Sequence, residues 1–226
     1  MGKTLLLAAY IVYAAFWLRF FAHTLVWWKA AQRSQGPAGP RSRAQAWVFF
    51  AADVLFFMRL LAVNPALWLG EWVFHASFLL VLLRHLRYFL DPVPDWVWRM
   101  QTPGLVAGYV LPCTLAYILA VRLCTRHEKY AAPANVFLLG LVLVISSLGV
   151  VMHAMFKPDL VEVKWFILGI LRFAPSGVPE SLLFVLHFGL VLVLIPILPT
   201  HIFTAPLVMM EARKREQALR LVMHEK

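Results

Sequence analysis

Four histidines, two in each of two apolar stretches, are the residues whose types and positions indicate chemistry. His75 and His85 lie ten residues apart in one apolar stretch, and His187 and His201 lie fourteen residues apart in another. At about 1.5 Å per helical residue, these spacings are roughly 15 and 21 Å along a helix axis. If the two helices run antiparallel, His85 faces His187 and His75 faces His201. We call His85 and His187 the outer pair, and His75 and His201 the inner pair.

An imidazole inside a membrane needs a partner, because a polar nitrogen atom is costly to bury alone. Imidazole is also an axial ligand of haem iron, so two pairs at two depths indicate two haem groups that carry electrons across the membrane core. Cys113 and Cys124 are the only cysteines, and the chain has no C-x-x-C-H motif, which leaves non-covalent haem b. The alternative is that each histidine forms a hydrogen bond to a neighbouring helix.

The composition is that of an integral membrane protein. Of the 226 residues, 62% are hydrophobic and 14% are charged, and the mean hydropathy is +0.76. The net charge of +10 comes from basic residues between apolar runs, where the positive-inside rule predicts them. We therefore expect the chain to lie in a lipid bilayer and not to bind nucleic acid. The first apolar run shows no convincing cleavage site, and we interpret it as a retained span of a single membrane domain, 1–226.

The hydropathy pattern predicts an all-α integral membrane protein, a bundle of five transmembrane helices at about 4–28, 66–90, 104–121, 134–156 and 180–205. We expect an interfacial or re-entrant helix at 44–63, an outer amphipathic helix at 160–173 and a cytoplasmic tail at 211–226. Five spans put 12 Lys and Arg inside and 7 outside, whereas a sixth span at 44–63 gives 9 and 10. The positive-inside rule therefore favours five, with the N-terminus periplasmic and the C-terminus cytoplasmic in a bacterial inner membrane.

Three arginines are candidates to bind haem propionates, because a planar guanidinium matches a carboxylate. Arg84 and Arg87 lie beside His85, and Arg19 lies on the first span. For Arg84 and Arg87 the alternative is that they extend to lipid phosphates at the membrane surface.

Two residues are candidates for a quinone site, which needs a hydrogen-bond or proton partner near a haem. They are His153, at the outer end of the fourth span, and Lys164, on the outer amphipathic helix. A plain interhelical hydrogen bond is the alternative for His153. The sequence shows no nucleophile triad and no phosphate-binding loop, so we expect no catalytic residues beyond possible quinone chemistry.

The chain resembles the cytochrome b gamma subunit of respiratory nitrate reductase over most of its length. The likeness rests on the two His pairs and on these stretches: Trp17-Leu18-Arg19-Phe20, Trp28-Lys29-Ala30-Ala31, Leu186-His187-Phe188, His201-Ile202 and Ala205-Pro206-Leu207. The insert at 44–63 is similar to the related subunits of sulfate reducers, above all the cytochrome b subunit of the high-molecular-weight cytochrome c (Hmc) complex, with the Dsr-complex cytochrome b as neighbour.

This resemblance implies two b haems, one on each His pair, and menaquinone as a further cofactor candidate. It also implies an outer multihaem cytochrome c and an inner iron–sulfur subunit as electron partners. We therefore expect a di-haem subunit that transfers electrons across the membrane within a respiratory complex. The rivals are a haem-free membrane anchor and a transporter, although the chain lacks the paired broken helices and acidic midplane residues that build ion sites.

Overall fold

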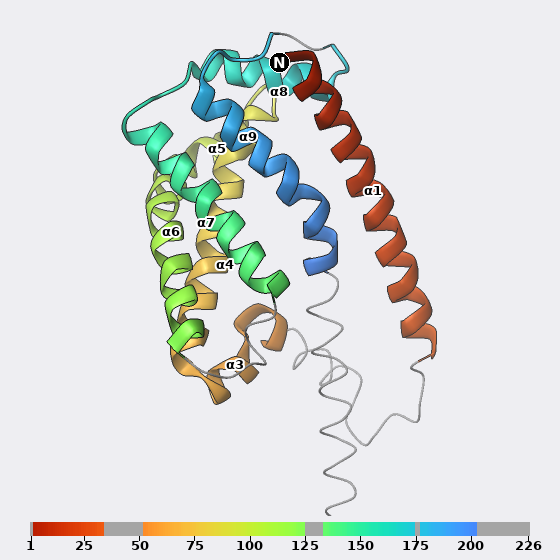
Figure 1. The fold of residues 1–226 in the computed structure, drawn as a ribbon, viewed down its shortest axis with the longest axis vertical. Coiled ribbons are helices and arrows are strands. Elements are labelled where there is room, and N and C mark those ends of the chain that lie inside the picture. Colours follow the sequence, from red (N-terminus) through yellow and green to blue (C-terminus); the bar gives the residue numbers. More distant parts are fainter. Residues whose placement is uncertain (1, 34–51, 125–132, 175–176, 203–226) are drawn as a thin grey trace, which may run out of the picture.

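The computed structural model describes residues 2–33, 52–124, 133–174 and 177–202, which form helices and connecting turns without a strand among them. Five helical segments are long and apolar enough to cross a membrane (Figure 1). They are α1 (Gly2–Arg33), α4 (Pro65–His85) with η1 (Leu86–Tyr88), α6 (Gln101–Cys124), α7 (Pro133–Ala154), and α9 (Leu182–Leu194) with η3 (Ile195–Ile197) and helical residues up to 202. The predicted five-span, all-helical integral membrane bundle is confirmed.

The second span is shorter than the predicted 66–90. Asn64 caps its beginning by accepting a hydrogen bond from the Leu67 N–H at 3.0 Å, and Pro65 occupies the first turn, where no N–H is needed. The α-helix ends at His85, and a single 3₁₀ turn carries the chain to Tyr88. Proline follows at position 92 and again at 94, so the chain turns there before the short helix α5 (Asp95–Arg99).

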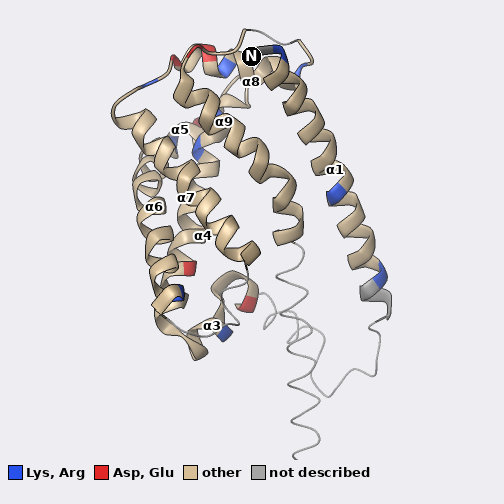
Figure 2. Ribbon diagram, in the orientation of Figure 1, with Lys and Arg blue, Asp and Glu red and all other residues tan. Residues whose placement is uncertain are grey.

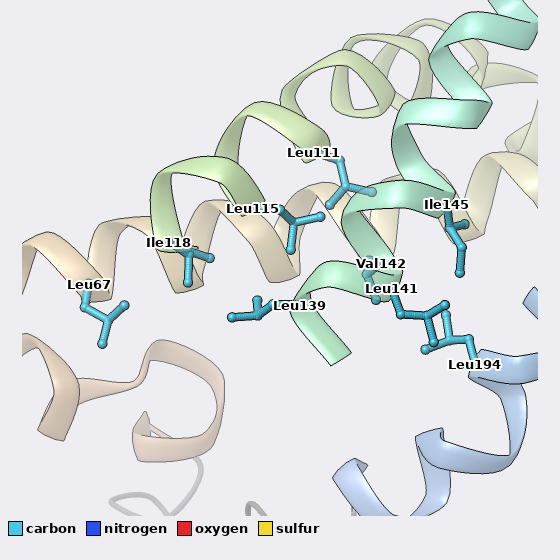
Figure 3. Packing of buried hydrophobic residues seen from close by; sticks show 9 residues of the cluster. All are labelled: Leu67, Leu111, Leu115, Ile118, Leu139, Leu141, Val142, Ile145 and Leu194. Atoms are coloured by element: carbon cyan, nitrogen blue, oxygen red, sulfur yellow. The ribbon is translucent and has the colours of Figure 1, made fainter. Parts of the chain in front are cut away.

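The closest helix pair is α4 against α6, and glycines permit the approach at both ends of the crossing. A Cβ atom added at Gly70 would lie 2.8 Å from Ile118, and one added at Gly104 would lie 2.6 Å from the Cβ of Arg84. Between these points α6 and α7 contribute most of the buried core, which α4 and α9 complete (Figure 3). The core residues are Leu67, Leu111, Leu115, Ile118, Leu139, Leu141, Val142, Ile145 and Leu194. This packing fixes α4 in the bundle.

The amphipathic helix predicted at 160–173 is present as α8 (Leu160–Leu171), which lies across one end of the bundle (Figure 1). Asp159 caps its N-terminus by accepting hydrogen bonds from the N–H groups of Val161 and Glu162. Its buried face packs Phe166 edge-on against Phe184 and Phe188 of α9. The helix stops sooner than the predicted 160–173, because Phe173 adopts a left-handed conformation (φ 55°).

The predicted helix at 44–63 is described only from residue 52. It is not one continuous helix, because residues 52–56 and α3 (Met58–Val63) are separated by Phe57, which has a left-handed backbone (φ 48°). The indole N–H of Trp68 donates to the Phe56 carbonyl at 2.7 Å and so gives this backbone oxygen a hydrogen bond where the helix is broken. Asp53 is buried and lies 4.0 Å from Arg59. This segment lies at the opposite end of the bundle from α8 (Figure 1).

Charged residues gather toward the two ends of the bundle, and the middle sections of the spans are largely uncharged (Figure 2). Helix α1 stands at the edge and packs on α9, η3 and α8. Most of its length is exposed, as expected of a helix that faces lipid. The predicted tail at 211–226 and the last three residues of the predicted span 180–205 lie outside the described residues.

Candidate functional site

Helix α4 holds His75 and His85 by the same contact. In each ring Nδ1 lies 2.7 Å from the backbone carbonyl four residues earlier, that of Glu71 for His75 and that of Val81 for His85. A carbonyl oxygen only accepts hydrogen bonds, so Nδ1 carries the proton in both rings. The neutral ring then keeps a free lone pair on Nε2, which is the state in which an imidazole binds a metal ion.

The inner pair is brought together by α4 and the helical end of the last span. The His75 and His201 ring centroids are 6.5 Å apart and the ring planes differ by 14°. Two imidazoles that share one metal ion through facing nitrogen atoms have centroids roughly 6 Å apart, because each metal–nitrogen bond is about 2 Å. The inner pair therefore has the separation needed by two axial ligands of one haem iron.

Aromatic rings and a cavity surround the inner pair. Phe57 and Phe74 lie against His75, with ring centroids 4.9 and 4.6 Å from it. The left-handed turn between residue 56 and α3 thus places a ring directly on this histidine. A partly open cavity of about 200 Å³ lies between His75 and His201, lined by aliphatic and aromatic side chains with few polar atoms. An apolar cavity with a few polar groups is typical of a cofactor site.

An ion pair borders this cavity. Arg122 of α6 donates to the carboxylate of Glu71 at 2.6 Å, and the side chains are 18% and 12% exposed. The other carboxylate oxygen of Glu71 lies 3.9 Å from Nδ1 of His75. The Nε atom of Arg122 is buried and makes no hydrogen bond among the described residues. The inner pair is therefore next to one fixed negative and one fixed positive charge.

The outer pair lies between α4, α7 and α9. His187 is within electrostatic range of His85, and its ring passes Gly149 of α7, where an added Cβ would be 3.5 Å from Cε1 of the ring. The buried Nδ1 atom of this ring has no hydrogen bond among the described residues. A buried imidazole nitrogen without a partner is costly in an apolar protein. The backbone contact gives His85 the ring orientation of a ligand, and iron ligation by the outer pair stays a prediction.

Arg84 and Arg87 face Gln101 at the start of α6. The Gln101 side-chain oxygen accepts from Nε of Arg84 at 3.4 Å and from Nη1 of Arg87 at 2.8 Å. Arg87 also donates to the hydroxyl of Tyr88 and lies over its ring, 4.6 Å from the centroid. Both arginines are half-buried, so they are held at the outer pair within the protein. Propionate binding by them stays a prediction.

Arg19 has a different partner. Its Nη1 donates to the Pro196 carbonyl at 3.0 Å, where α9 changes into a 3₁₀ turn. One turn further along, His23 is hydrogen-bonded to the Thr200 hydroxyl at 3.2 Å. These contacts tie α1 to the irregular part of the last span. That Arg19 binds a propionate stays a prediction, since its contact here is with the backbone.

The two quinone candidates have separate partners. Nδ1 of His153 lies 3.1 Å from the Tyr109 hydroxyl, an α6–α7 contact of the kind that the sequence left open as an alternative. Lys164 lies 3.2 Å from Asp91, which Arg172 also contacts at 3.3 Å. The hydrogen bond and charge of Lys164, with those of Arg172, lower the pKa of Asp91. This cluster attaches α8 to the end of the α4 segment.

Four polar residues near the histidines were missed by sequence reasoning: Glu71, Gln101, Tyr109 and Arg122. Glu71 could have been found, because an acidic residue four positions before a candidate ligand in a membrane span is unusual. The predicted span ended at 121, whereas α6 continues to Cys124 and keeps Arg122 in the bundle. Among the described residues no three His, Cys, Asp or Glu side chains form a metal-binding group, so the His pairs are the ligand sets that the structure offers.

Comparison with known proteins gives two curated relatives. Both are Hdr-like menaquinol oxidoreductase cytochrome b-like subunits, from Archaeoglobus profundus and Archaeoglobus fulgidus, and both are 33% identical to this chain. The matches extend over 150 and 149 residues, cover 59% of this chain in each case, and cover 44% and 45% of the relatives. The chain therefore spans less than half the length of these relatives. No family model and no solved structure matches it.

Proposed function

We propose that this chain is a membrane cytochrome b subunit that holds two b haems and carries electrons across the membrane within a quinol-linked respiratory complex. The observation that carries the proposal is the inner pair, in which two rings from distant spans lie 6.5 Å apart. The fixed Nδ1 proton on His75 supports it, because it directs the free Nε2 lone pair outward. The names of the two curated relatives point to the same class of protein.

In this proposal the four histidines bind iron, His75 and His201 at the inner haem and His85 and His187 at the outer one. When bound, each haem supplies one-electron chemistry. The chain contributes the positions. Helix α4 sets the two depths, about 15 Å apart along its axis, and its backbone carbonyls fix the ring orientation. The apolar spans exclude water between the two depths.

The proposed partners lie on the two sides of the membrane. Outside, the electron donor or acceptor is a multihaem cytochrome c or the quinone pool, and inside it is an iron–sulfur subunit. The distribution of basic residues supports a periplasmic position for the α8 end. The relatives are menaquinol oxidoreductase subunits by name, which favours menaquinone as the small-molecule partner.

A quinone site near the outer pair involves His153 and, in this structure, Tyr109. An imidazole hydrogen-bonded to a phenol is able to exchange a proton with a quinol. Lys164 is a weaker candidate, because Asp91 already binds it. His153→Ala should slow haem reduction by a menaquinol analogue while dithionite reduction stays complete. If quinol reduces the variant at the wild-type rate, the assignment of His153 is wrong.

The experiment that tests the main proposal is a dithionite-reduced minus oxidised visible spectrum of the purified full chain, with haem quantified per chain. We expect two b haems. His85→Ala and His187→Ala should lose one, and His75→Ala and His201→Ala should lose the other. His127→Ala, in the connection between α6 and α7, is the control and should keep both. A well-folded preparation without haem would leave the membrane anchor as the function.

A further inference from the structure

We propose that the Glu71–Arg122 ion pair sets the redox potential of the inner haem, with Arg122 holding the Glu71 carboxylate away from His75. This inference rests on the proposed function, since it assigns a role toward the haem that His75 and His201 would share. It makes Glu71 and Arg122 positioning residues that act through His75.

Glu71 approaches His75 in two ways. Its backbone carbonyl accepts the Nδ1–H of His75 at 2.7 Å, and its carboxylate lies 3.9 Å from the same nitrogen. A small side-chain rotation would let the carboxylate compete for that proton. A carboxylate that accepts the proton of a ligating histidine increases the basicity of the ring and stabilises the oxidised metal.

Arg122 opposes that rotation. It binds the carboxylate at 2.6 Å, a charge-assisted contact between α6 and α4 across 51 residues of sequence. Both side chains are largely buried beside the cavity, so water and salt screen their charges only weakly. The position of the carboxylate relative to His75 therefore depends on Arg122.

The outer histidine on the same helix lacks this arrangement. Val81 occupies the position that Glu71 occupies at the inner site, and the charged neighbours of His85 are Arg84 and Arg87. The two sites thus share a ligand geometry on α4 and differ in the charge beside it. Nearby positive charge favours the reduced state of a haem and nearby negative charge favours the oxidised state. The asymmetry gives each haem its own potential.

The test is a spectroscopic redox titration of the full chain in lipid, with the inner haem identified as the one absent from His201→Ala. Arg122→Gln leaves Glu71 free to approach His75 and should lower the inner midpoint potential. Glu71→Gln keeps the shape of the side chain, removes the negative charge and should raise that potential. The double variant should lie between them, and Arg122→Lys should stay near the wild-type value.

The outer haem is the internal control. Its potential should not move in these variants, whereas Arg87→Gln should lower the outer potential and leave the inner one unchanged. The electron paramagnetic resonance signal of the oxidised inner haem should also change in Arg122→Gln, because ligand basicity changes with it. If both single variants shift the inner potential in the same direction, or neither shifts it, the proposal is wrong.

Failure of this inference is distinguishable from failure of the proposed function. A chain without haem contradicts the proposed function, whereas two haems with an unresponsive inner potential contradict only the role of the ion pair. If Arg122→Gln does not keep both haems, the inner potentials of Glu71→Gln and Arg122→Lys test the proposal instead. A raised inner potential in Glu71→Gln with no shift in Arg122→Lys supports the proposal, and an unchanged potential in Glu71→Gln overturns it.

Discussion

The middle and the last residue of α4 present the same residue type in the same local geometry but in different surroundings. In the middle of the helix, His75 has a partner ring at 6.5 Å, two phenylalanines, a cavity and an ion pair. At the last residue of the helix, His85 has two arginines nearby, and the buried Nδ1 of His187 makes no hydrogen bond among the described residues. Local helix structure therefore fixes the ring orientation, while tertiary contacts determine the electrostatics. Sites built on one helix can thus be tuned separately.

The largest expected effect concerns a contact that only the outer pair has. Gly149→Leu should displace the His187 ring, because the added side chain extends into the space that the ring occupies next to α7. We expect loss of one of the two haems, the outer one, measured by haem quantification and the reduced-minus-oxidised spectrum. Gly149→Ala is the control, since its Cβ would sit at an ordinary contact distance of 3.5 Å. Loss of the inner haem instead would contradict the geometry.

The second prediction compares the two glycines of the α4–α6 crossing. Gly104→Ala places a Cβ 2.6 Å from the Arg84 Cβ and 3.0 Å from the Leu80 carbonyl, atoms that cannot rotate away, so it should cost about 1–3 kcal/mol. Gly70→Ala meets side-chain atoms of Ile118 and Tyr117, which can shift, and should cost less. Thermal unfolding in detergent measures both.

Gly140→Ala is the matched control for this pair, because nothing lies within 4 Å of its added Cβ. It should be neutral or slightly stabilising, as alanine is the better helix former. Equal losses of stability in Gly70→Ala and Gly104→Ala would show that the two ends of the crossing are equally rigid, which would contradict the prediction.

The smallest effect concerns the attachment of α8 at the outer end. Asp91 binds Lys164 and Arg172, which lower its pKa in the folded state. Its stabilising contribution is therefore present above the unfolded pKa, near 3.9, and is lost as the pH falls through the lower folded value. The protection of α8 amides, measured as the exchange rate relative to the intrinsic rate at the same pH, should fall at low pH in the wild type. Asp91→Asn should exchange faster near pH 6 and lose this pH dependence, while exchange at α3 is unaffected.

The sequence predicted the spans and the pairing of histidines because both follow from periodic, local quantities. Hydropathy over some twenty residues defines a span, and residue spacing defines depth. The partners of the charged residues could not be predicted in this way. Arg122 meets Glu71 across 51 residues, and Arg19 meets the Pro196 carbonyl across 177. Such contacts depend on how helices are rotated in the bundle, which hydropathy alone does not specify.

The break in the helix at Phe57 is a second feature that the sequence could not predict. Left-handed backbone is rare for a large side chain, and no glycine or asparagine stands there to signal it. The count of basic residues on the two sides favoured five spans over six, but it could not show where the segment turns. The stacking of Phe57 on His75 explains why the turn matters, because it connects this segment to the inner site.

The 3₁₀ turn η3 changes the angular relation between the two histidines of the last span. Fourteen α-helical residues leave two side chains about 40° out of phase, because each residue turns by about 100°. A 3₁₀ turn winds by up to about 120° per residue, so η3 reduces the angle between His187 and His201. On the unbroken α4, His75 and His85 remain about 80° apart. The last span thus brings its two histidines closer to one line than α4 does, and a single residue inserted between them would turn His201 away from its partner.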